Sequence, residues 1–266
     1  MNNHIICTSC NHQTENLEQH YCPQCWGPVR YHRVTQTAPT EGIGIWKYAH
    51  LLPEEIKLPR SWNPGGTPLI EAPALAQDWG VGEVWVKDET AGPTHSFKDR
   101  VVGVALARAL YLGLDTLACT STGNLGHSLA AACAREGLGC VVLVPETVEP
   151  SKIAAAAALG AQIVPIQGTY DDVNRTAHLL ADQTDWGWVN MTLRPFYAEG
   201  SKTLLWEILD QLDEIPDHIV APAASGSLYS KLYAAAKQVG RDGICFHAAQ
   251  AEGCSPIAQA WENGWQ

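Results

Sequence analysis

The chain has 266 residues, of which 46% are hydrophobic and 17% are charged, and its formal net charge is −11. This apolar content can offset the entropy of ordering, which excludes a disordered chain, while no run reaches the ~20 apolar residues of a membrane span. An acidic chain is also a poor non-specific binder of nucleic acid, so we expect neither nucleic-acid nor membrane partners.

Residues 1–30 have the cysteine spacing of a zinc ribbon and carry no export signal, so a cytoplasmic protein is expected. Two C-x-x-C pairs lie eleven residues apart; each can form a tight knuckle, and two knuckles complete a tetrahedral site of four thiolates. The alternatives are a pair of redox dithiols and a rubredoxin-like iron site. Because the module has little apolar mass, a metal would supply much of its folding free energy. We predict a structural Zn²⁺ site formed by Cys7, Cys10, Cys22 and Cys25.

Residues 31–64 are expected to form a connector, after which residues 65–266 alternate short β-rich runs with longer runs rich in alanine and leucine. Repeated strand–helix units predict a mostly parallel sheet that helices cover on both faces. The predicted strands are residues 83–87, 116–120, 140–144, 162–166, 188–191, 218–221 and 244–250. The predicted helices are residues 99–112, 125–135, 151–159, 171–182, 200–212 and 228–239.

Five further cysteines are scattered through the α/β region, in apolar or alanine-rich surroundings. Without an export signal, structural disulfides are not expected. A reduced cysteine behaves as a small hydrophobic residue and is among the most frequently buried side chains. We therefore expect buried, reduced thiols at Cys119, Cys133, Cys140, Cys245 and Cys254.

Three polar, glycine-containing segments follow predicted strands, at the edge where open α/β sheets bind their ligands. In the first segment, Lys98 lies at the start of a predicted helix and is followed in sequence by Asp99 and Arg100. A nearby cation lowers the pKa of a lysine and makes its amine nucleophilic, although a solvated side chain is the ordinary alternative.

The second and third segments each precede a helix and can bind anions. Backbone N–H groups and hydroxyls at a helix N-terminus form a cradle for phosphate or carboxylate. The second segment runs from Ser121 through Thr122 and Gly123 to Asn124, and an ordinary helix cap would also explain it. The third, residues 223–229, contains a Ser-Gly-Ser sequence and is weaker evidence for a phosphate site.

Together these segments resemble the pyridoxal-phosphate enzymes of fold type II, and among them the threonine synthase family. The sequence SFKDR at residues 96–100 is similar to that family's cofactor-lysine motif, and STGN at residues 121–124 to its substrate-and-cofactor loop. The sequence GGTPL at residues 65–69 is similar to its G-x-T-P-L motif. The resemblance covers about residues 60–258. It implies an α/β fold with tryptophan-synthase-β-like parallel sheets covered by helices, here preceded by the zinc ribbon, and a homodimer.

The resemblance also implies an activity, the conversion of O-phospho-L-homoserine and water to L-threonine and phosphate. Lys98 would form a Schiff base with pyridoxal 5′-phosphate and move protons on the substrate, a phosphorylated amino acid. Arg100 is a further candidate cation for the substrate phosphate. The resemblance assigns cofactor binding to Phe97, Lys98, Asn124, Ser225, Gly226, Ser227 and Leu228, and substrate binding to Lys87, Ser121, Thr122, Gly123 and Arg194.

Two segments depart from the family's pattern. The loop at residues 224–227 reads ASGS rather than a sequence rich in glycine and asparagine, and residues 190–197 lack the N-x-x-N-P-x-R arrangement. The family's partner for the pyridine nitrogen comes from a C-terminal part, so we expect the sequence to continue beyond Gln266.

Two other classes of function are open. The same scaffold serves sibling enzymes such as threonine dehydratase and cysteate synthase, which product analysis would separate. The second class is a non-catalytic protein that binds a partner through its zinc ribbon. Residues 1–30 contain Arg30 as their only lysine or arginine, so the ribbon has no basic stripe for nucleic acid.

Overall fold

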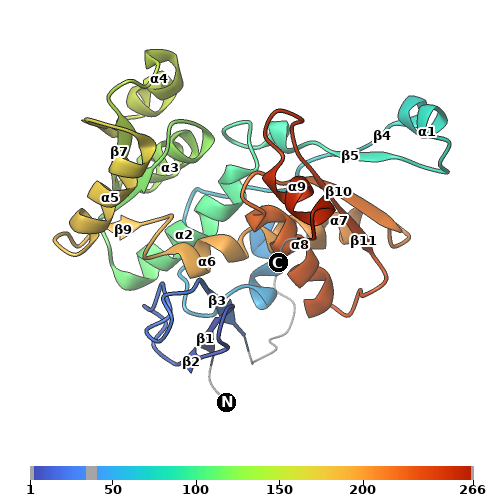
Figure 1. Cartoon of the computed structure of the whole chain (residues 1–266), viewed down its shortest axis with the longest axis horizontal. Coiled ribbons are helices and arrows are strands. Elements are labelled where there is room, and N and C mark those ends of the chain that lie inside the picture. Colours follow the sequence, from blue (N-terminus) through green and yellow to red (C-terminus); the bar gives the residue numbers. More distant parts are fainter. Residues whose placement is uncertain (1–2, 34–40, 265–266) are drawn as a thin grey trace. The chain divides into compact units, whose positions relative to one another are not determined.

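The computed structural model describes residues 3–33 and 41–264, which form two units, Met1–Gly200 and Ser201–Gln266 (Figure 1). Residues 34–40 of the predicted connector lie outside the described residues, as do residues 1–2 and 265–266 at the two ends. None of the described helices combines the length and the apolar character that crossing a membrane requires.

The chain begins with a small antiparallel sheet, drawn in blue in Figure 1. Its strands are β1 (His4–Cys7), β2 (Gln13–Thr14) and β3 (Val29–His32), in the order β2-β1-β3. Cys7 ends β1, and the second cysteine pair lies in the turns before β3. This arrangement is compatible with the predicted zinc-ribbon module, and β3 continues past residue 30 to His32.

The ribbon packs on the body of the first unit through β3. The ring centroid of Tyr31 lies 5.3 Å from that of Phe196, in helix α6 (Arg194–Glu199). The Tyr31 hydroxyl donates a hydrogen bond of 2.8 Å to Glu55 Oε2, and burial raises the pKa of this hydroxyl. The guanidinium carbon of Arg108 lies 4.3 Å from the Phe196 ring centroid. Buried aromatic and polar contacts therefore join the ribbon to the body. The 3-10 helix η1 (Gly44–Leu51) comes later in the chain.

A four-stranded parallel sheet with helices on both faces forms the body of the first unit, as predicted. Its strands are β6 (Thr116–Thr120), β7 (Gly139–Pro145), β8 (Gln162–Ile166) and β9 (Gly187–Trp188), in the order β8-β7-β6-β9, and its other helices are α2 (Lys98–Leu112), α3 (Asn124–Glu136), α4 (Pro150–Ala158) and α5 (Tyr170–Ala181). β7 is buried on both faces, because Val142 and Val144 belong to the core under α2 and α3 while Val141 and Leu143 belong to the core under α5. This explains why β7 reads as a continuous apolar run.

Within the first unit, one predicted strand lies outside the parallel sheet. β5 (Trp85–Lys87) pairs antiparallel with β4 (Leu69–Glu71), and helix α1 (Pro73–Trp79) lies in the connection between them. Trp85 and Val86 are 40% and 43% exposed, so this strand lacks the cover on both faces that a parallel strand needs. The short 3-10 helix η2 (Glu89–Ala91) follows β5.

A second predicted strand is shorter than expected, since β9 ends at Trp188 rather than at Met191. The carbonyl oxygen of Trp188 accepts hydrogen bonds from the N–H groups of Met191 (3.1 Å) and Leu193 (2.9 Å). These bonds turn the chain and lead it into α6.

The second unit contains α7 (Lys202–Gln211), β10 (His218–Pro222), α8 (Ser227–Gln238), β11 (Cys245–Ala249) and α9 (Pro256–Glu262). β10 and β11 pair in parallel, with α8 as their connection. The Tyr229 hydroxyl of α8 donates to the carbonyl oxygen of Phe246 (3.2 Å), so α8 covers one face of the pair. Val220 is 64% exposed on the other face.

The cysteine prediction is confirmed at three positions and wrong at two. Cys119, Cys133 and Cys140 are buried free thiols in the first unit. Cys245 and Cys254 are exposed, because Cys245 lies on the uncovered face of β11 and Cys254 in the turn that follows. The apolar residues next to a cysteine in sequence do not show which face of its strand packs against other elements.

Candidate active site

Lys98 is the first residue of α2, and its side chain is half-buried. Its Nζ lies 5.4 Å from the centroid of the Phe97 ring. Among the described residues of the first unit, none accepts a hydrogen bond from Nζ. Burial lowers the pKa of Lys98, which increases the neutral fraction of the amine. A half-buried amine with a lowered pKa is suited to act as a nucleophile or a base.

The Arg100 guanidinium, which we expected to assist Lys98 or a substrate phosphate, contacts other groups instead. Arg100 is 1% exposed, and its Nε and Nη2 donate to the two carboxylate oxygens of Glu89 at 2.7 and 2.8 Å. Nη2 also donates to Thr67 Oγ1 at 2.9 Å. The lowered pKa of Lys98 therefore results from burial. Arg100 instead joins the start of α2 to η2 through its ion pair with Glu89.

Asp99 joins the start of α2, where Lys98 lies, to α3, a contact that no sequence motif indicates. Its buried carboxylate accepts a hydrogen bond from the Thr94 N–H (2.8 Å) and one from the Thr94 hydroxyl. It also accepts a bond of 2.7 Å from the Ser128 hydroxyl, in the second turn of α3. Since α3 begins at Asn124, this carboxylate fixes the two predicted polar segments relative to one another.

The second segment occupies the turn between β6 and α3. Ser121 and Thr122 are half-buried, whereas Gly123 and Asn124 are exposed at the helix N-terminus. The Gly123 N–H donates to Ser121 Oγ at 3.3 Å. Anion binding by this segment stays a prediction, for which the unpaired amides of a first helical turn, together with these hydroxyls, would be suited.

A network of side chains beneath this turn was also missed. Asn190 Nδ2 donates to Thr120 Oγ1 at 2.8 Å, and the Thr120 hydroxyl donates to Asn174 Oδ1 at 2.8 Å. The Tyr170 hydroxyl donates to the Thr120 carbonyl oxygen at 3.1 Å. A threonine at the end of a buried strand was the available signal, but its partners lie 54 and 70 residues away in sequence.

The two predicted substrate cations differ in their surroundings. Lys87 ends β5, and its half-buried Nζ donates to the carbonyl oxygen of Thr67 at 2.6 Å. Arg194 is the exposed first residue of α6. The Tyr197 hydroxyl, one helical turn on, has its pKa raised by burial and lowered in part by the charge of Arg194.

The predicted phosphate loop belongs to the second unit and joins β10 to α8. Ser225 is exposed, while Gly226, Ser227 and Leu228 are half-buried at the start of the helix. Gly226 has φ 76° and ψ −3°, a left-handed conformation that favours glycine. This tight turn directs the N–H groups of the first turn of α8 toward the loop, which suits a phosphate.

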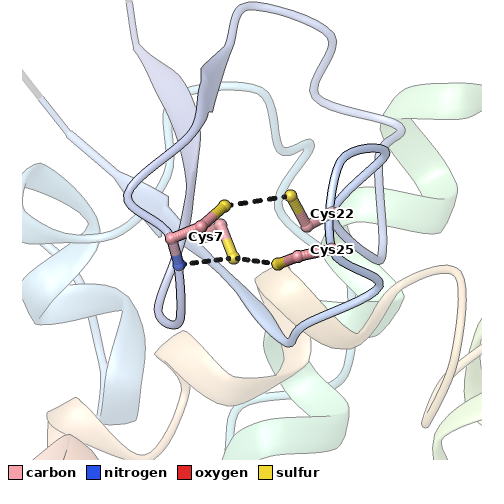
Figure 2. A group of neighbouring side chains, drawn as sticks. Cys7, Cys22 and Cys25 are labelled. Atoms are coloured by element: carbon pink, nitrogen blue, oxygen red, sulfur yellow. Dashed lines mark hydrogen bonds between the residues drawn. The ribbon is translucent and has the colours of Figure 1, made fainter.

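The four N-terminal cysteines form a cluster in the first unit. The side chains of Cys7, Cys22 and Cys25 point toward one another (Figure 2). Cys7 Sγ lies 3.5 Å from Cys25 Sγ, and Cys10 Sγ lies 3.6 Å from Cys22 Sγ. Four thiolates around a tetrahedral Zn²⁺ would be about 3.8 Å apart, as follows from a Zn–S distance of about 2.3 Å. The N–H groups of Cys10 and Ser9 donate to Cys7 Sγ, and the first of them does most to lower its pKa to about 6.

Comparison with known proteins connects these features to a family. Residues 61–266 match the family described as pyridoxal-phosphate dependent enzyme. A threonine synthase of Methanosarcina acetivorans is 36% identical, over 98% of this chain and 68% of that protein. A threonine synthase of Methanocaldococcus jannaschii is 37% identical, over 83% of this chain and 56% of that protein. The chain thus spans roughly 56–68% of the length of these two curated relatives.

A solved structure supports the fold. Threonine deaminase isoform 2 from Solanum lycopersicum matches with a TM-score of 0.68 and 21% identity, over 88% of this chain and 66% of that chain. At this identity the match shows the fold alone. It agrees with the fold-type II architecture expected from the sequence.

Proposed function

Because the chain belongs to the pyridoxal-phosphate-dependent enzyme family and is similar to threonine synthases, we propose that it acts as a threonine synthase. The proposed reaction converts O-phospho-L-homoserine and water to L-threonine and phosphate. The observation that carries the proposal is the half-buried Lys98, with its lowered pKa, held by Asp99 next to the turn at residues 121–124. The cytoplasm and a homodimeric state are part of the proposal, and rest on the resemblance.

The residues of this chain fit pyridoxal 5′-phosphate. Burial lowers the pKa of Lys98, which favours the neutral amine, and a neutral amine is the form that reacts with an aldehyde. The left-handed turn at Gly226 opens a helix whose N–H groups suit the cofactor's phosphate. When bound, the cofactor supplies an aldehyde and an aromatic ring that accepts electron pairs. The proposed cofactor ligands are Phe97, Lys98, Asn124, Ser225, Gly226, Ser227 and Leu228.

The proposed substrate ligands act on the two charged ends of O-phosphohomoserine. Ser121, Thr122 and Gly123 would hold the carboxylate by their hydroxyls and the helix N-terminus, and Lys87 and Arg194 would bind the phosphate. In its neutral form, the Lys98 amine would accept a proton from the substrate. The resulting Lys98 ammonium group would later donate the proton back. The chain's acidic balance repels a phosphorylated substrate at long range, so these local cations must bind it.

We also propose that Cys7, Cys10, Cys22 and Cys25 bind a structural Zn²⁺ ion. The sulfur–sulfur distances and the N–H groups directed at Cys7 Sγ support this proposal. Four thiolates leave no open coordination position, so the ribbon would stabilise the fold and take no part in the reaction. The ribbon would then be a module of its own, followed by a connector and the cofactor-binding region.

The experiment assays the protein with three substrates. With O-phospho-L-homoserine we expect threonine and phosphate in equal amounts, and Lys98→Ala should lower the rate by about 10²-fold or more, while exposed Lys152→Ala leaves it unchanged. Formation of 2-oxobutyrate from threonine, or of cysteate from O-phosphoserine and sulfite, would instead indicate a sibling enzyme.

A second measurement does not depend on activity. Borohydride reduction of the protein in pyridoxal phosphate should leave a phosphopyridoxyl group on the peptide that contains Lys98, a mass gain equal to the cofactor less one water plus two hydrogens. A protein in which that peptide stays unmodified would contradict the role of this lysine.

A further inference from the structure

The exposed face of the β10–β11 pair gathers three side chains that can bind a metal ion. In the parallel register, His218 lies opposite Cys245, and Val220 lies opposite His247. Successive side chains of a strand alternate between its faces, so Cys245 and His247 share one face. All three potential ligands are exposed, on the face that α8 leaves uncovered.

Their distances suit a single ion. One ligand atom from each residue lies within 4.8 Å of the others. Nδ1 of His218 and Nε2 of His247 are 3.0 Å apart, and a tetrahedral Zn²⁺ ion would place two such nitrogens about 3.3 Å apart. The two rings are tilted by 46°, with centroids 5.2 Å apart. These two nitrogens share a hydrogen bond, which an ion bound by both would replace.

We propose that His218, Cys245 and His247 form a second Zn²⁺ site, with the fourth position open to water. Two imidazole nitrogens and a thiolate suit Zn²⁺, whereas Mg²⁺ and Ca²⁺ prefer oxygen ligands. The site differs from the ribbon in kind, because the ribbon offers four thiolates and this site offers three ligands of two types. One ligand comes from β10 and two from β11, so the ion would cross-link a sheet of only two strands.

The exposure of Cys245 supports this assignment. A lone apolar-flanked cysteine was expected in a core, and instead its thiol lies in solvent beside two imidazoles. Cys254 is also exposed in the second unit but does not belong to the group of His218, Cys245 and His247. It therefore provides a matched control.

The test counts metal ions per chain. The protein, reduced with a phosphine, receives one equivalent of Zn²⁺, which the four thiolates of the ribbon bind first, and is then titrated with Co²⁺. The parent chain should bind one equivalent of Co²⁺ and show the absorbance of a single thiolate ligand. Cys245→Ser and His247→Gln should weaken this second binding event at least tenfold, while Cys254→Ser and the exposed His178→Gln should bind Co²⁺ as the parent does.

Three results would overturn the proposal. In the first, the parent chain binds no Co²⁺ after the ribbon has taken up its Zn²⁺. In the second, the variants at Cys245 and His247 bind Co²⁺ as tightly as the parent does. In the third, the control variants lose Co²⁺ binding. Far-UV circular dichroism on each variant checks that the fold is retained, and His218→Gln repeats the test at the third ligand.

Discussion

Asp99 shows how one buried carboxylate sets the geometry of the proposed site. It accepts hydrogen bonds from Thr94 and Ser128, and none of its described hydrogen-bond partners is a basic side chain. An amide at this position would replace one acceptor oxygen by an NH2 donor, which would either face the Thr94 N–H or force the two hydroxyls to turn and accept. The attachment of the segment around Lys98 to α3 would then be weaker.

The first prediction concerns this carboxylate. Asp99→Asn should lower the free energy of unfolding by about 1–3 kcal/mol, the usual effect of leaving buried polar groups unpaired. The exposed Asp78→Asn, on α1, should change it by less than about 0.5 kcal/mol. Urea denaturation measures both, and equal stability of the two variants would contradict the structural role of Asp99.

The second prediction concerns the pH at which Lys98 reacts. Burial disfavours its charged form, so its pKa lies below the ordinary lysine value of 10.5. The amine is protonated below the lowered pKa and becomes nucleophilic as the pH rises through it, before an unperturbed lysine does. Competitive acetylation across pH, read by mass spectrometry, should therefore modify Lys98 at a lower pH than a denatured sample of the same chain. Identical profiles for native and denatured protein would exclude a buried amine.

At the scale of elements, α6 and α2 pack so closely that only glycine fits between them. A Cβ built on Gly200 would lie 2.6 Å from the Arg100 carbonyl oxygen and 2.7 Å from Val101 Cα. Both are backbone atoms of α2, which cannot move aside as a flexible side chain can. This contact holds α6, with Arg194 at its start, against the helix that begins at Lys98.

The third prediction follows from this contact. Gly200→Ala should lower the free energy of unfolding by about 1–3 kcal/mol, as overpacking does in other cores. Gly82→Ala is the matched control, because no atom lies within 4 Å of its Cβ position, and it should change stability by less than about 0.5 kcal/mol. A Gly200 variant as stable as the control would mean that the two helices are less tightly packed than described.

At the scale of the first unit, the ribbon and the body share an interface. Tyr31 from β3 packs on Phe196, which Arg108 contacts from α2. A change in the ribbon should therefore alter the stability of the parallel sheet, although the ribbon is not part of it.

The fourth prediction tests this coupling. Cys22→Ser removes one thiolate of the proposed zinc site and should lower the melting temperature by about 2–4 °C for each kcal/mol lost. Cys254→Ser removes an exposed thiol outside the site and should leave the melting temperature unchanged. The melting temperature is read from the loss of far-UV circular dichroism. If both variants melt at the same temperature, the ribbon does not stabilise the body of the first unit.

Much of the fold could be predicted from local patterns, while the contacts that position the site could not. The periods of apolar residues indicate α2, β6 and β8, because each period follows from the geometry of one element. β5 and Cys245 were misplaced, since their surroundings depend on which neighbours cover each face. The bond between Ser128 and Asp99 joins residues 29 apart in sequence, and no spacing rule predicts it.

The double burial of β7 has a consequence for hydrogen exchange. Its amides lie between two neighbouring strands, and the side chains of Val142, Leu143 and Val144 are 1%, 0% and 0% exposed. Solvent can reach these protons only when the whole sheet opens. They should be the last of the first unit to exchange in deuterated water, and their rate would report its global opening free energy.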